Sequence, residues 1–197
     1  MTTGNDRWEM FRALVLETRS VRRFDEKQTV PEEVLRDLVD LARQTASGGN
    51  KQPLKYVISW TEEKNAAIFP HLHWAAYLKD GKPAEGERPA AYILILLDRD
   101  IANGAGCDHG IAAQTLMLGA RAMGLGGCVL GAVDRGPIRA AIGLPDRYEI
   151  LLVVALGKPK EKVILEPVVG QRIEYWRDAE GVHHVPKRTL DEVLLPY

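Results

Sequence analysis

The stretch AAYILILLD, residues 90–98, is apolar from its first residue to Leu97, with no polar side chain alternating along it. A strand with one solvated face alternates apolar and polar residues, whereas a strand buried on both faces is apolar throughout. We therefore expect a strand buried inside a sheet. GCVLGAV at 127–133 and YEILLVVALG at 148–157 show the same pattern, and LKYVISW at 54–60 predicts a shorter strand, so the count is four.

Helical patterns dominate the rest of the chain. Residues 5–18 place apolar side chains on one helical face, and a second helix is predicted to open at Pro31, a residue favoured at the first helical position. Thr61 is expected to start a third helix, which Pro70 must kink or end. The predicted apolar faces of the first two helices are Trp8, Phe11, Leu14 and Val15, and Val34, Leu35, Leu38, Leu41 and Ala42.

A further helix over residues 108–123 is unusually poor in side-chain bulk. Because backbones can approach such a surface closely, the helix is either the central helix of the core or part of a subunit interface. Residues 161–197 show little periodicity and include Trp176, so we expect this tail to lie against a partner subunit. The small residues of the helix are Gly110, Ala112, Ala113, Gly119, Ala120 and Ala122.

Composition limits the possible classes of protein. The 197 residues carry a formal net charge of −1, and we expect one domain over residues 1–197. Nucleic-acid and membrane-surface binding both need a basic excess, so neither partner is expected. Charged residues interrupt the first twenty positions, which therefore lack the apolar stretch of a signal peptide and predict a cytoplasmic protein. The two cysteines, Cys107 and Cys128, are too few for a disulfide framework.

Several common site motifs are missing or incomplete. GAGCDHG at 104–110 has its third glycine one place late for a dinucleotide fingerprint, and GLGGCVLG at 124–131 lies between a helix and a strand, which is the wrong order. The histidines and cysteines show no metal-ligand spacing, so no metal is expected. No GxSxG motif supports a hydrolase.

The remaining features suit one anionic, aromatic ligand. TRSVRRF at 18–24 offers charge-assisted donors for a phosphate in Arg19, Ser20 and Arg22. Lys187 and Arg188 offer more from the other end of the chain. ASGGNKQP at 46–53 supplies a turn of small residues and amides that fits a flat polar ring edge. Each of these segments alone is commonly an ordinary loop or a solvated charge. Their combination in one chain favours a ligand site.

Four segments resemble the FMN-dependent nitroreductase family, in the family's order. TRSVRRF resembles its RRSxRxF segment, and ASGGNKQPLKYVI resembles PSxxNxQPWxFxV. GIAAQTLMLGARAMGLGGCVLGAV resembles the family's long helix and the strand that follows it. VHHVPKRTLDEVL resembles a common C-terminal ending. The match extends over nearly the whole chain.

The resemblance implies an α+β fold with a mainly antiparallel central sheet of four to five strands flanked by helices. It also implies an intertwined homodimer in which residues 161–197 form a C-terminal arm packed on the partner, with two FMN sites at the interface. By this resemblance, the FMN phosphate is held by Arg19, Ser20, Lys187 and Arg188, and Arg22 lies at the ribityl chain and the N1/O2 edge. The partner contributes Ser47, Gly48 and Asn50 to the ring. The ring face and the N5 edge are lined by Val129, Leu130 and Gly131.

The implied activity is ping-pong hydride transfer from NADH or NADPH, through flavin N5, to nitroaromatic, quinone or other electron-poor acceptors. The protein positions the ring and the substrate, and no general-acid residue is required. Two alternatives stay open. One is a specialised flavoenzyme of the same fold, such as an enone reductase, a dehalogenase or a peptide dehydrogenase. The other is a non-catalytic flavin-binding protein.

Overall fold

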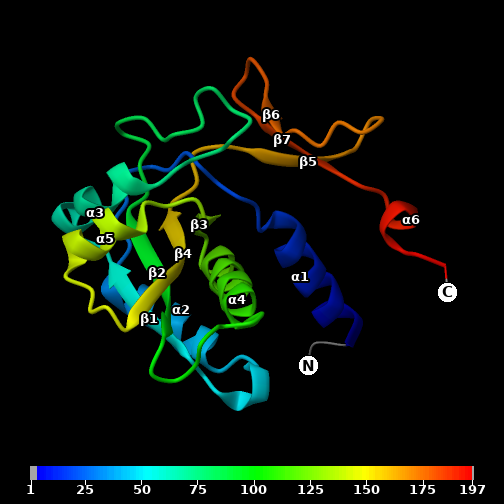
Figure 1. Ribbon diagram of the computed structural model, residues 1–197. Coiled ribbons are helices and arrows are strands. Elements are labelled where there is room, and N and C mark those ends of the chain that lie inside the picture. Colours follow the sequence, from blue (N-terminus) through cyan, green and yellow to red (C-terminus); the bar gives the residue numbers. More distant parts are fainter. Residues whose placement is uncertain (1–3, 197) are drawn as a thin grey trace.

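A four-stranded antiparallel sheet forms the centre of the computed structural model, which describes residues 4–196 (Figure 1). The strand order is β1–β2–β4–β3, and the four predicted strands are confirmed. Every residue of β2 is buried, as its unbroken apolar sequence predicts. The strands are β1 (Leu54–Ser59), β2 (Ala91–Asp98), β3 (Gly126–Leu130) and β4 (Tyr148–Gly157).

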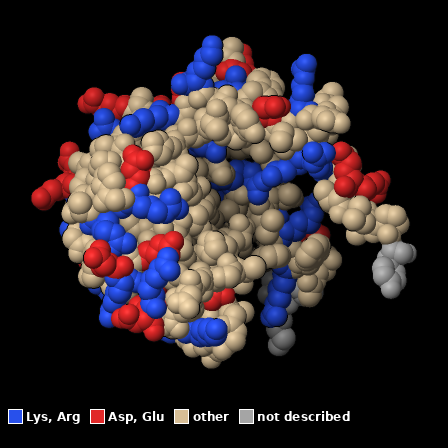
Figure 2. Space-filling view, in the orientation of Figure 1, with Lys and Arg blue, Asp and Glu red and all other residues tan. Residues whose placement is uncertain are grey.

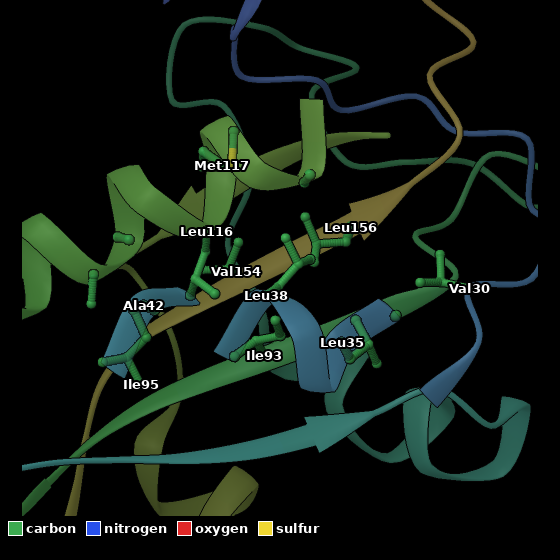
Figure 3. Close-up of a cluster of buried hydrophobic side chains, with 14 of the residues drawn as sticks. Val30, Leu35, Leu38, Ala42, Ile93, Ile95, Leu116, Met117, Val154 and Leu156 are labelled. Carbon is green, nitrogen blue, oxygen red and sulfur yellow. The ribbon is translucent and has the colours of Figure 1, made fainter. Parts of the chain in front are cut away.

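Helices α2 (Glu32–Arg43) and α4 (Asp108–Ala122) cover one face of the sheet. Figure 3 shows their apolar side chains meeting those of β2 and β4. Leu41 was predicted to be buried but is 49% exposed, because α4 places the side-chain-free Gly119 beside it. The labelled core residues of this layer are Val30, Leu35, Leu38, Ala42, Ile93, Ile95, Leu116, Met117, Val154 and Leu156.

The other face of the sheet is covered by α3 (Glu62–Ile68) and α5 (Arg135–Ile142), which lie together in Figure 1. Helix α3 begins after Thr61, whose hydroxyl accepts a hydrogen bond from the Lys64 N–H, and a 3₁₀ turn containing Pro70 follows it. Helix α5 was not predicted from the sequence. Its first turn contains Gly136 and Pro137, a dipeptide typical of turns and loops, so the local sequence does not indicate a helix start.

The small residues of α4 serve close packing inside the protomer. A Cβ placed on Gly119 would lie 2.7 Å from the Leu38 side chain on α2, and Ala112, Ala113 and Ala120 are buried. Such close approach requires residues without bulk. Of the two alternatives left open by the sequence, the structure therefore supports a core helix.

Both ends of the described chain extend away from this body. Helix α1 (Gly4–Glu17) projects from the body in Figure 1 and is joined to α4 by the Glu17–Arg121 ion pair at 2.8 Å, and none of its described residues is buried. Residues 163–187 form a second, three-stranded sheet of order β5–β7–β6, which we call the arm sheet. Its strands and the final helix are β5 (Val163–Pro167), β6 (Trp176–Arg177), β7 (His183–Lys187) and α6 (Leu190–Val193).

Gly127 is a position where the fold tolerates no side chain. An added Cβ would lie 2.8 Å from each of three groups, the Ala155 carbonyl oxygen, the Leu156 side chain and the Met117 sulfur. Because the backbone of β4 cannot move freely, we expect Gly127→Ala to lower the free energy of unfolding by about 1–3 kcal/mol. Chemical denaturation measures this effect. Gly136→Ala is the control, since its Cβ would meet no atom within 4 Å, and equal losses in both variants would contradict the packing described here.

Candidate functional site

A deep hollow lies between the helix-and-sheet body and the C-terminal arm, with Lys and Arg side chains gathered along its margin (Figure 2). The formal net charge of the chain is only −1, so this gathering is local. Oriented positive charge in a concave surface attracts anions. The hollow is therefore the candidate binding site for the anionic ligand that the sequence predicts.

The segment containing Arg19, Ser20 and Arg22 is attached to the edge of the main sheet. Ser20 forms an isolated parallel bridge with Gly127, and the Val21 N–H donates to the Gly127 carbonyl at 2.8 Å. β3 is an edge strand, so residues 18–21 occupy the beginning of its free edge. The phosphate-binding candidates and the β3 candidates are thus neighbours.

Arg19 is held at the C-terminal end of α1. Its Nε donates to the Thr18 carbonyl at 2.6 Å, and its Nη2 donates to the Val15 carbonyl at 3.1 Å. A cation at this end of a helix also interacts favourably with the helix dipole. Burial lowers the pKa of the Arg19 guanidinium. A guanidinium has five N–H donors, so the two bonds to carbonyls leave others for an anion.

Arg22 lies further inside. Its guanidinium carbon is 4.8 Å from the centre of the Tyr175 ring, and its backbone N–H donates to the Glu161 carboxylate. Its Nε is buried and has no hydrogen-bond partner among residues 4–196. Burial raises the pKa of the neighbouring Cys128 thiol, and the Arg22 charge opposes that rise. A buried donor without an acceptor is costly, and it marks a place where a ligand can bind.

The other predicted residues divide into two groups. On β3, Val129 is exposed and Leu130 is buried, and Gly131, the residue after β3, is exposed. Lys187 ends β7, and among residues 4–196 Arg188 pairs only with Glu192, at 3.5 Å. Both cations are exposed on the arm, and within the described chain neither contacts the 18–22 segment.

Ser47, Gly48 and Asn50 lie at the other end of α4. The Asp108 carboxylate, in the first turn of that helix, accepts from the Ser47 hydroxyl at 2.6 Å and from the Gly48 N–H at 2.9 Å. These two hydrogen bonds hold the pKa of Asp108 below its usual range. Asn50 has a left-handed backbone, with φ 53°. This turn lines a groove of about 700 Å³ that also includes residues 104–108.

The two ends of α4 are far apart. Ser47 and Gly48 contact Asp108 in the first turn of α4, whereas Glu17, just before the Arg19 segment, pairs with Arg121 in the last turn at 2.8 Å. A 15-residue helix is about 22 Å long. One protomer therefore does not bring the Ser47 group and the Arg19 group together. Asp108 was not predicted as the residue that fixes this turn, although an acidic residue in the first turn of a helix is a recognisable signal.

A histidine between two carboxylates fastens the arm sheet. His184 Nδ1 lies 3.0 Å from Glu166 and Nε2 lies 3.1 Å from Asp178, and the ring stacks on Trp176 with centroids 3.9 Å apart. The hydrogen bonds to Asp178 and then Glu166 raise the pKa of His184 above its ordinary value of 6.5. The carboxylates therefore favour the charged imidazolium.

We expect the arm to loosen as the pH rises. A raised pKa in the folded state means that His184 stabilises the fold fully below about pH 6.5, and that this contribution is lost as the pH passes through the folded-state pKa. NMR titration of the imidazole resonances measures that pKa, which should exceed that of an unfolded reference peptide. In Asp178→Asn it should fall. A wild-type pKa at or below the reference would show that the carboxylates do not act in this way.

No set of three or more His, Cys, Asp or Glu residues within 4–196 is arranged to hold a metal ion. No helix in the same range is both long enough and apolar enough to cross a bilayer.

The four-stranded antiparallel sheet between two helical layers is an α+β fold of the nitroreductase-like class. The pattern of the Nitroreductase family matches residues 15–158, so the chain belongs to the nitroreductase family. It is 28% identical over 151 residues to a Methanothermobacter thermautotrophicus protein named "Putative NADH dehydrogenase/NAD(P)H nitroreductase", a match that covers 73% of this chain and 74% of the relative.

Solved structures share the fold. A nitroreductase family protein from Clostridium novyi NT superimposes with a TM-score of 0.64 at 22% identity, covering 76% of this chain and 85% of its own. A protein from Exiguobacterium sibiricum 255-15, described as a "putative nitroreductase in complex with FMN", gives a TM-score of 0.63 at 21% identity, covering 76% and 88%.

Proposed function

We propose that this protein is an FMN-dependent NAD(P)H oxidoreductase of the nitroreductase type, which reduces nitroaromatic, quinone or other electron-poor acceptors. The observation that carries the proposal is the buried, unpartnered Nε of Arg22 beside the free edge of β3. Family membership supports it, as does the fold shared with a protein described as an FMN complex. The names of the relatives support NADH or NADPH as the electron donor.

The residues present fit FMN. Arg19 and Ser20, joined by Lys187 and Arg188 from the arm, would hold the phosphate through charge-assisted hydrogen bonds. Arg22 would lie at the N1/O2 edge of the ring. The exposed Val129 and Gly131, with Leu130 between them, leave the edge of β3 open beside it. The partner subunit's Ser47, Gly48 and Asn50 would complete the ring site.

When bound, FMN supplies reversible two-electron chemistry and accepts hydride at N5. Arg22 would place a fixed positive charge at the ring edge where negative charge would develop, and fixed charges act strongly at a partly buried position such as this one. The open edge of β3 leaves room for donor and acceptor to bind in turn. No described side chain needs to act as a general acid.

We also propose an intertwined homodimer in which residues 161–197 pack on the partner. Trp8 and Phe11 on α1 are 58% and 51% exposed, and Leu190, Val193, Leu194 and Leu195 near the C-terminus are more exposed still. Exposed apolar side chains in such numbers on both terminal segments favour an interface. Because the dimer completes the ligand site, light scattering at micromolar concentration should give twice the mass of the chain. A folded monomer that carries FMN would contradict this proposal.

Steady-state kinetics with varied NAD(P)H and varied acceptor test the proposed activity. One site used in turn by donor and acceptor gives parallel double-reciprocal lines. Menadione and a nitroaromatic compound are suitable acceptors. Tight FMN binding without turnover of any donor would instead indicate a non-catalytic flavin-binding protein.

A further inference from the structure

An ionic group built on a buried Glu161–Arg177 pair, with the exposed Asp80 at its outer end, lies behind Arg22. Its centre is Glu161, whose side chain is 1% exposed. One oxygen of the carboxylate accepts from the Arg22 backbone N–H, and the other accepts from Arg177 Nη2 at 2.9 Å. Arg177, 7% exposed, also reaches Asp80 at 3.0 Å through Nη1. We call Glu161, Arg177 and Asp80 the Glu161 cluster.

The Glu161 cluster joins three separate parts of the chain. Glu161 precedes the arm sheet, Arg177 belongs to β6, and Asp80 lies in the loop before β2. The backbone of residue 22 belongs to the segment that contains Arg19 and Ser20. The same carboxylate therefore contacts the segment with one half of the proposed phosphate site and the arm sheet, which ends at Lys187 and leads directly to Arg188.

The neighbouring aromatic residues reinforce this link. Tyr175 packs against the Arg22 guanidinium on one side and against the His183 ring on another, with ring centroids 5.4 Å apart. His183 is fully buried, and burial lowers its pKa to about 4. It therefore stays neutral at pH 7, and the charge of Glu161 is balanced by arginine.

We propose that Glu161 and Arg177 are positioning residues that hold the two halves of the phosphate site in register. They contact no proposed ligand directly and act through the Arg22 backbone and β6. This inference rests on the proposed function. The buried Glu161–Arg177 ion pair is costly to disturb, because removal of one partner leaves the other without compensation. The pair links the Arg22 segment to β6, and such a link would hold the two halves of the site at a fixed spacing.

The test compares the dissociation constants of FMN and riboflavin, measured by quenching of flavin fluorescence. General loosening of the protein weakens both ligands, whereas misalignment of the phosphate site weakens FMN alone. The ratio of the two dissociation constants therefore distinguishes a misaligned phosphate site from a general loss of protein stability. We expect Glu161→Gln and Arg177→Lys each to reduce the preference for FMN by about tenfold or more. Glu174→Gln, an exposed change on the arm, is the matched control and should keep the wild-type ratio.

Net charge alone predicts a different result. Glu161→Gln removes a negative charge and would then increase the preference for an anion, while Arg177→Lys would leave it unchanged. Arg177→Lys keeps the positive charge beside Glu161, so this variant should still fold. Its single ammonium cannot replace the guanidinium that contacts both Asp80 and Glu161, so the link between them is still lost. Wild-type ratios in both variants would overturn the inference. A wild-type protein without preference for FMN over riboflavin would instead overturn the proposed phosphate site.

Discussion

FMN should bind at least a hundredfold more tightly than riboflavin, which lacks only the phosphate. Hydrogen bonds to charged groups contribute roughly 1.5–3 kcal/mol each, and Arg19 together with Lys187 or Arg188 would supply at least two. Every 1.4 kcal/mol is about tenfold in affinity. Lys187 has no ion-pair partner in the part of the chain described, so its charge is available for this role. Fluorescence titration of the apoprotein with each flavin measures the difference.

The matched variants are Lys187→Ala and Lys55→Ala. Lys55 is exposed on β1, the strand at the opposite edge of the sheet from β3. Lys187→Ala should weaken FMN and leave riboflavin unchanged, while Lys55→Ala should affect neither. The expected difference should also shrink at high salt, because exposed charges are screened. Equal affinities for the two flavins in the wild-type protein would contradict the assignment of these residues to a phosphate.

Arg22→Ala should lower the midpoint potential of bound FMN and slow its reduction by NAD(P)H. A cation whose interaction strengthens as the ring becomes anionic stabilises the reduced flavin more than the oxidised one. For a two-electron couple, about 30 mV corresponds to 1.4 kcal/mol, so the shift should be about that size or larger. Dye-equilibrated titration of the fully loaded fraction measures it.

Arg23→Ala is the control, because it removes the same charge one residue further along. The Arg23 guanidinium is paired with Asp80 at 2.8 Å and with Glu87 at 3.4 Å, so it is already neutralised. Its removal should leave the potential almost unchanged. If Arg22→Ala kept the wild-type potential and reduction rate, Arg22 would not be the cation at the N1/O2 edge.

The main sheet could be predicted because its signal is local. β2 and β4 are apolar along nearly their whole length, and short apolar runs bounded by turn residues are typical of buried strands. The length of α4 was also predictable, but its place was not, since small residues suit a core and an interface equally well. The contact between Gly119 and Leu38 that decides the question joins two helices distant in sequence.

The arm sheet shows the limit of periodicity. β5 and β7 have five residues each and β6 has two, and they are held by contacts such as the Trp176–His184 stack rather than by one apolar face. The role of Glu161 could not be predicted from the sequence either. Its partners Arg22 and Arg177 are 139 and 16 residues away, so no spacing in the sequence marks it.

The decisive measurement is the visible absorption spectrum of the purified protein, recorded anaerobically before and after addition of NADH or NADPH. We expect flavin absorption bands that survive gel filtration, a stoichiometry of one FMN per chain, and rapid bleaching by at least one of the two donors. Bound FMN that neither donor bleaches would contradict the proposed oxidoreductase activity. Protein that remains colourless after incubation with excess FMN would contradict the cofactor assignment itself.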